Sequence, residues 1–110
     1  MFDIKGMMGK VEEAQKKLKE AQDTLHTLDA MGESGGGMVH VRVNGNRKII
    51  QLSIDPSLLT KEDKEMTQDL VIAATNKALE NIEPKIQEHL KNATAGVLPN
   101  IPGFNLNNFM

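Results

Sequence analysis

The stretch "GESGGGMVHVRVNGNRKIIQLSID", residues 32–55, decides the fold of this chain. Residues 39–43 alternate valine with polar side chains, and residues 50–54 alternate isoleucine or leucine with polar ones. A period of two is typical of strands that bury one face. Between the two runs, Asn44-Gly45 tolerates the positive φ angles of a two-residue hairpin turn. The stretch therefore predicts an antiparallel hairpin over residues 38–54.

A hairpin of two strands is not stable alone in water, so this one needs further cover. A third strand near residues 28–33, just before the glycines, is one way to complete the sheet. Packing on helices or on the sheet of a partner is the other. We therefore expect an α+β protein with a small antiparallel sheet.

The glycine run at residues 35–37 does not have the context of a phosphate-binding loop. A P-loop needs a following Lys-Ser or Lys-Thr and then a helix. A dinucleotide fingerprint also leads into a helix. Here the glycines lead into a strand, so they predict a tight backbone link and no nucleotide site. We accordingly expect no catalysis and no cofactor.

The segment before the sheet has the pattern of a long amphipathic helix. Its apolar residues recur at alternating steps of three and four, as in a heptad seam. Gly6 and Gly9 weaken the first turns, so the firm part is expected from about residue 9 or 10 to Leu28. The seam consists of Ile4, Met7, Val11, Ala14, Leu18, Ala21, Leu25 and Leu28.

Two interpretations of this helix remain open. It can lie on its own sheet, or part of it can project and pack on a second chain. The narrow, unbroken seam and the small core, which has no aromatic residue in its central part, favour the second interpretation and a homodimer. The candidates for the dimer interface are Val11, Ala14, Leu18, Ala21 and Leu25.

The second half of the chain predicts another helix. Asp55-Pro56 ends the strand, and Thr60 can cap a helix that begins near Lys61. Pro84 has no amide hydrogen for the carbonyl of Glu80, so we expect a kink or a break there. We expect a single α-β-α domain over residues 1–96. The Pro- and Asn-rich tail, residues 97–110, is expected to be extended unless Phe104 and Phe109 dock.

Composition narrows the function further. The chain has 110 residues, a net charge of −2 and no cysteine, which excludes disulfides and thiolate metal ligands. The spacing of its three histidines matches no metal motif. The N-terminus lacks the apolar core of a signal peptide, and no apolar run is long enough for a membrane span. We therefore expect a cytoplasmic protein with no metal, no membrane contact and no small-molecule substrate.

The sequence resembles the YbaB/EbfC family of bacterial nucleoid-associated proteins. The resemblance is carried by residues 32–59, by "KEMTQDLVIAATNKAL" at residues 64–79 and by "PGF" at residues 102–104. It implies a helix–strands–helix protomer in a tweezer-like homodimer, in which the sheets form the body and the helices form arms. It also implies sequence-tolerant DNA binding and a role in nucleoid organisation or gene regulation. Pro84 departs from the smooth second helix that the resemblance implies.

Two classes of function are therefore compared. The first is a dimeric module that binds duplex DNA through its phosphates. The second is a homodimeric protein-interaction adaptor without direct DNA contact, which the near-neutral charge favours. Phenylalanine occurs only near the chain ends, which argues against base stacking as a main contribution.

The DNA-binding candidates form three groups. In order of preference they are Lys10, Lys16 and Lys17 of the first helix, then Lys85 and Lys91 of the second, then Arg42, Arg47 and Lys48 of the hairpin. The helices come first because the arms of a tweezer-like dimer are what could embrace a duplex.

Overall fold

The computed structural model describes residues 4–95 and divides the chain into two compact units. One unit comprises residues 25–86, and the other comprises residues 1–24 together with 87–110. Both contain part of helix α2, Lys64–Thr94. The single domain predicted over residues 1–96 stays a prediction, because two units that share a helix can still unfold together. The predicted tail, residues 97–110, lies outside the described residues.

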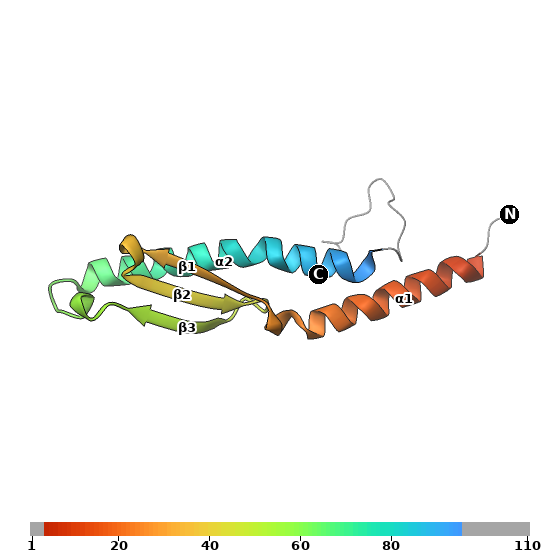
Figure 1. Cartoon of the computed structure of the whole chain (residues 1–110), viewed down its shortest axis with the longest axis horizontal. Helices are drawn as coiled ribbons and strands as arrows, with labels where there is room; N and C mark the ends of the chain where they lie inside the picture. The colour runs from red at the N-terminus through yellow and green to blue at the C-terminus, as the bar shows by residue number, and fades with distance from the viewer. Residues whose placement is uncertain (1–3, 96–110) are drawn as a thin grey trace. The chain divides into compact units, whose positions relative to one another are not determined.

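The first unit holds a three-stranded antiparallel sheet in the order β1-β2-β3 (Figure 1). The α+β class and the hairpin are confirmed, and the third strand occurs where the sequence suggested it. The strands are β1 Asp29–Ser34, β2 Val39–Asn44 and β3 Ile49–Ile54, with short 3-10 turns at Leu25–Thr27, Gly35–Gly37 and Pro56–Leu58.

Helix α2 packs along the face of the sheet that β1 and β2 present (Figure 1). The valines of β2 are all buried, and so are the α2 residues that face them. Gly32 of β1 allows this packing, because a Cβ built there would overlap backbone atoms of Ala74 and Ala78. Helix and strand therefore touch backbone to backbone at this point. The buried residues are Val39, Val41 and Val43 from β2 and Ala74, Ala78 and Ile82 from α2.

The hairpin turn differs from the predicted Asn44-Gly45 turn. Asn44 is the last residue of β2, and its carbonyl accepts a hydrogen bond from the Arg47 amide at 2.9 Å, so Gly45 and Asn46 are the central residues. The positive φ falls on Arg47, at 61°. Gly45 is required for another reason: a Cβ there would overlap the carbonyl of Leu25.

The glycine run forms the predicted backbone link between β1 and β2. Gly35, Gly36 and Gly37 have φ angles of 62°, 65° and 93°, a region that other residues rarely adopt. The run continues directly into a strand and provides no helix N-terminus for a phosphate.

Helix α1 spans Ile4–Asp23, so it begins earlier and ends earlier than predicted. The Thr24 hydroxyl lies 3.0 Å from the carbonyl oxygen of Ala21 and 3.2 Å from that of Glu20. It donates a hydrogen bond to carbonyls of the last turn, which lack a partner within the helix. Leu25 and Leu28 continue the heptad spacing but lie beyond the helix. The predicted extension to Leu28 is therefore wrong.

Helix α2 begins three residues later than predicted, after Thr60 accepts a hydrogen bond from the Asp63 amide at 3.2 Å. Pro84 lies inside the helix, which continues to Thr94. A break at Pro84, one of the two expected effects, does not occur; the kink stays a prediction. Ile82 and Ile86 are buried on either side, and their packing offsets the missing hydrogen bond. No helix among residues 4–95 is long and apolar enough to cross a membrane.

Candidate nucleic-acid interface

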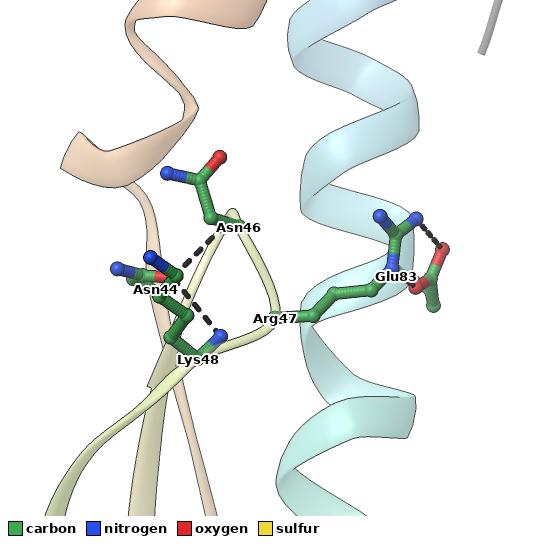
Figure 2. Close-up of polar contacts among 5 residues, drawn as sticks. All are labelled: Asn44, Asn46, Arg47, Lys48 and Glu83. Atoms are coloured by element: carbon green, nitrogen blue, oxygen red, sulfur yellow. Dashed lines mark hydrogen bonds and ion pairs between the residues drawn. The ribbon is translucent and has the colours of Figure 1, made fainter.

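Arg47, a candidate of the hairpin, is held by helix α2. Its guanidinium donates hydrogen bonds through Nε and Nη2 to the carboxylate of Glu83, with an Nη2–Oε2 distance of 3.1 Å (Figure 2). The hydrogen bonds from Arg47 lower the pKa of Glu83, and the same contact raises the pKa of Arg47. Arg47 therefore fastens the turn to the helix and is not a free cation.

The other two hairpin candidates are closer to a free surface. Arg42 lies on the sheet face opposite α2, where its Nη1 is 3.5 Å from a carboxylate oxygen of Asp29. Lys48 is exposed, and its amide donates to the side-chain oxygen of Asn44 (Figure 2). Its ammonium group makes no ion pair within the described part of the chain. A shallow hollow of about 200 Å³ adjoins Arg42 and is lined also by Met31, His40, Val41, Gln51 and Ser53.

Lys85, a second-choice candidate, also has a structural role. Its ammonium donates a hydrogen bond of 2.6 Å to the carbonyl of Asp29, at the start of β1. One turn earlier, the Asn81 amide donates to the carbonyl of Met31 at 2.9 Å. Both contacts fasten the edge strand β1 to α2. Lys91 is exposed and has no ion pair among residues 4–95.

The lysines of α1 are the most accessible candidates. Lys10, Lys16 and Lys17 are all exposed, and only Lys17 has an ion pair within the described range, to Glu13 at 3.6 Å. Lys10 and Lys17 are seven residues apart, so they lie on one side of the helix about 10 Å apart along its axis. Lys16 lies about 100° around the helix from Lys17. The helix therefore brings Lys10 and Lys17 together and leaves Lys16 on another side.

The dimer-interface candidates are divided by the structure. Ala14, Leu18 and Ala21 are buried within the chain itself. Val11 is exposed on α1, and Leu25 is half-buried in the turn before the sheet, in the other unit. Three of the five candidates are therefore covered inside one protomer.

Sequence reasoning missed an exposed apolar surface on β3. Leu52 pairs with Val41, so both lie on the helix side of the sheet, but Val41 is 1% exposed and Leu52 is 50% exposed. Helix α2 covers β1 and β2 and leaves β3 open. Ile49 and Ile50 of the same strand are also exposed, and Ile50 sits at a register shift between β2 and β3. The alternation of β3 could show which face is apolar but not that one helix is too narrow to cover it.

The described residues contain no group of three or more histidine and acidic side chains that could hold a metal ion. The charged candidates described above instead fasten the sheet to α2 or lie exposed on the helices and on the open face of the sheet. Such an arrangement can bind a large charged partner by surface complementarity.

Comparisons with known proteins agree on the class of this chain. The family model for the YbaB/EbfC DNA-binding family matches residues 1–97. The chain is 42% identical over 106 residues to a nucleoid-associated protein of Bartonella bacilliformis, which covers 96% of this chain and 97% of that protein. It is 43% identical over 106 residues to a nucleoid-associated protein of Agrobacterium fabrum, with 96% and 98% of the two chains covered.

A solved structure supports the fold. The crystal structure of an uncharacterized protein from Helicobacter pylori matches with a TM-score of 0.68 and 29% sequence identity. The match covers 84% of this chain and 97% of that one. Together the matches point to a DNA-binding protein and not to an enzyme.

Proposed function

The chain belongs to the YbaB/EbfC DNA-binding family, and from this premise we propose that it binds duplex DNA through the phosphate backbone, largely without sequence specificity. In this way it contributes to nucleoid organisation and gene regulation, and it is located at the nucleoid. The relatives are named nucleoid-associated proteins, which supports the location. The observation that carries the proposed mode of binding is the set of exposed lysines on α1, of which Lys10 and Lys16 have no ion pair among residues 4–95.

Electrostatics explain how an acidic protein can bind DNA in this way. Each lysine placed on a phosphate releases condensed counterions, which favours binding whatever the base sequence. The net charge of −2 does not oppose this, because a local surface of one sign is what a nearby duplex meets. Lys10 and Lys17 provide two such cations on one side of α1. Arg47 and Lys85 are less suitable, since each is held by a different element of the fold, whereas Lys17 meets only the exposed Glu13 of its own helix.

We further propose that the protein acts as a homodimer. The apolar surface of Ile49, Ile50 and Leu52 on β3 supports a second copy at this strand. Edge strands with exposed apolar side chains readily pair with another chain. The burial of Ala14, Leu18 and Ala21 within the chain favours β3 over the α1 seam as the interface. Two copies would present two sets of α1 lysines to one duplex.

Binding to labelled duplexes of different base sequence, measured by fluorescence anisotropy at several salt concentrations, tests the proposal. Lys10→Ala/Lys17→Ala should weaken binding to every duplex alike. It should also lower the slope of log affinity against log salt by about one for each phosphate interaction that the substitutions remove. The control is Lys64→Ala/Lys77→Ala, which changes the net charge equally on α2 and should leave the slope unchanged.

Other outcomes would redirect the assignment. If Lys10→Ala/Lys17→Ala keeps the wild-type slope while Arg42→Ala/Lys48→Ala abolishes binding, the sheet carries the DNA surface. If wild-type protein shows no affinity for duplex DNA at low salt, the homodimeric protein-interaction adaptor becomes the better description.

A further inference from the structure

The apolar stripe of helix α1 is covered along only half of its length. Ala14, Leu18 and Ala21 are buried, whereas the first two turns of the same stripe are open to solvent. Ile4 is 60% exposed and Met8 is 59% exposed. Met7 and Val11 are exposed as well, and these four residues form the α1 patch, which is named so below.

The last part of α2 explains where the cover ends. The Nε2 atom of His89 lies 3.1 Å from the carbonyl oxygen of Ala21 and 2.9 Å from the hydroxyl of Thr24. Further along both helices, Lys17 and Ala93 line the same hollow of about 450 Å³. His89 on α2 thus lies beside Ala21 on α1, and Ala93 lies beside Lys17. The numbers rise along α2 while they fall along α1, so the two segments run antiparallel. Thr94, the last residue of α2, corresponds to about Lys16. Ala14 is the last buried residue of the stripe, so the α1 patch lies beyond the cover.

The chain that follows α2 suits this uncovered patch. Fifteen residues, 96–110, follow the last described residue, and none of them carries a charged side chain. Pro99 and Pro102 oppose continuation of the helix. The apolar members are Val97, Leu98, Ile101, Phe104, Leu106, Phe109 and Met110.

The tail is also long enough. From Ala14 to Ile4 helix α1 rises about 15 Å. Fifteen residues can extend up to about 50 Å. The tail starts beside the covered half of α1 and can therefore reach every residue of the α1 patch without moving either helix.

We propose that residues 97–110 dock on the α1 patch of the same chain. Ile4, Met7, Met8, Val11 and Glu12 line a hollow of about 330 Å³, which is apolar apart from the glutamate. Phe104 and Phe109 are the two aromatic side chains of the tail, and each is of a size that can enter it. Because the tail carries no charged side chain, its docking buries apolar surface without burying an unpaired side-chain charge. The docked tail thus covers the part of the apolar stripe of α1 that α2 leaves exposed.

The absence of cysteine allows a direct test in the full-length protein. A nitroxide is attached at Asn108→Cys, and the methyl signals of the methionines are followed by NMR with and without reduction of the label. We expect strong broadening of the Met7 and Met8 signals by the oxidised label. Met66, which is exposed at the start of α2, about 40 Å of helix before the tail begins, is the control and should not broaden.

A mixed sample shows whether the tail that docks on the α1 patch belongs to the same chain or to a second copy. Isotope-labelled protein without nitroxide is mixed with unlabelled protein that carries it. We expect no broadening of Met7 or Met8 in this sample, because the tail belongs to the same chain. Broadening of Met7 and Met8 in the mixed sample, in proportion to the fraction of nitroxide-bearing protein, would assign the α1 patch to the tail of a second copy and overturn the proposal. Failure of Met7 and Met8 to broaden in the first sample would overturn it as well.

Truncation after Ala95 gives an independent measurement. Amide hydrogen exchange over residues 7–12 should accelerate about tenfold, because the outer half of α1 loses its cover. The amides of residues 18–22, beside the part of α1 that α2 covers, serve as the control and should change little. Phe104→Ala/Phe109→Ala in the full-length chain should reproduce most of the acceleration. Unchanged exchange over residues 7–12 in the truncated chain contradicts docking.

Discussion

Glu83 of α2 accepts two hydrogen bonds from the guanidinium of Arg47, a residue that the hairpin turn holds at a φ of 61° (Figure 2). The contact joins the loop between β2 and β3 to the helix that covers the sheet. It also places a long side chain at a position where the left-handed backbone costs about 1–2 kcal/mol for a residue other than glycine. The ion pair therefore offsets part of a backbone strain in the same turn.

The pH dependence of stability should show this contact. The pKa of Glu83 in the folded protein is lowered by Arg47. The resulting stabilisation is present above the unfolded-state pKa of the carboxyl and is lost as pH falls through the folded-state value. Glu83→Gln should therefore lower the free energy of unfolding at neutral pH, by less than about 1 kcal/mol because the pair is exposed. The difference from wild type should vanish in acid, as followed by urea unfolding at a series of pH values.

Asp55 provides an internal comparison for that experiment. Its pKa is also lowered, chiefly by the hydrogen bond from the Ser57 amide, and this contribution is lost in acid in both proteins. The difference between wild type and Glu83→Gln thus isolates the ion pair. A difference that persists unchanged at low pH would mean that the introduced glutamine perturbs packing and that the charge of Glu83 contributes nothing.

Gly32 and Gly9 form a matched pair for testing the helix–strand contact. A Cβ at Gly32 overlaps the backbone of α2, whereas a Cβ at Gly9, on the exposed side of α1, meets nothing within 4 Å. Gly32→Ala should lower the free energy of unfolding by about 1–3 kcal/mol, because backbone atoms must move. Gly9→Ala should raise it by about 0.5–1 kcal/mol, since alanine favours the helix. Denaturant unfolding of both variants checks the prediction, and a neutral Gly32→Ala would show that sheet and helix separate without cost.

The glycine link should respond to backbone conformation alone. Gly36 has a φ of 65° and open space around it, so Gly36→Ala loses stability only through the left-handed region, by about 1 kcal/mol. Gly36→Asn should cost less, because asparagine tolerates that region. Thermal unfolding of the two variants distinguishes backbone strain from steric crowding. Crowding would make the larger asparagine cost more than alanine, whereas strain makes it cost less. Titration calorimetry with ATP or NAD should detect no binding to wild-type protein, and a tight complex would contradict the assignment of a purely structural link.

Local periodicity predicted the elements of this fold well because it reflects which face is buried. The alternation in residues 39–43 located β2, and the period of three and four located α1. The same periodicity could not locate the end of α1, since Leu25 and Leu28 keep the spacing after the Thr24 hydroxyl has closed the helix. Hydrophobic spacing reports a face and not the hydrogen bonds that end an element.

The roles of the charged residues were less predictable, because they depend on neighbours distant in sequence. Arg47 and Lys85 had the same appearance as Lys10 in the sequence, but Glu83 and the carbonyl of Asp29 hold them in the fold. Gly45 was explained by positive φ, whereas its actual constraint is the carbonyl of Leu25, twenty residues earlier. A close contact between residues that are distant in the sequence leaves no recognisable pattern in the residues around either of them.

The exposed strand β3 yields the last prediction, which concerns the proposed homodimer. Leu52 lies on the apolar helix-side face of β3, and Ser53 beside it faces the opposite side, across from His40. A carboxylate at position 52 would be buried without a partner in a dimer formed there. Leu52→Asp should therefore raise the dimer dissociation constant at least about 100-fold, equivalent to about 2.7 kcal/mol. Ser53→Asp introduces the same charge into the same strand and should change the constant much less.

Sedimentation equilibrium of the three proteins distinguishes this interface from the helix seam. In an isolated protomer the aspartate introduced at position 52 meets solvent, so far-UV circular dichroism of Leu52→Asp should remain that of the wild type. A folded Leu52→Asp monomer beside a dimeric Ser53→Asp protein locates the interface on the apolar side of β3. If both variants remain dimeric while Val11→Asp dissociates, the second copy binds at α1, where the heptad pattern first suggested it. A wild-type protein that stays monomeric at micromolar concentration would exclude both surfaces.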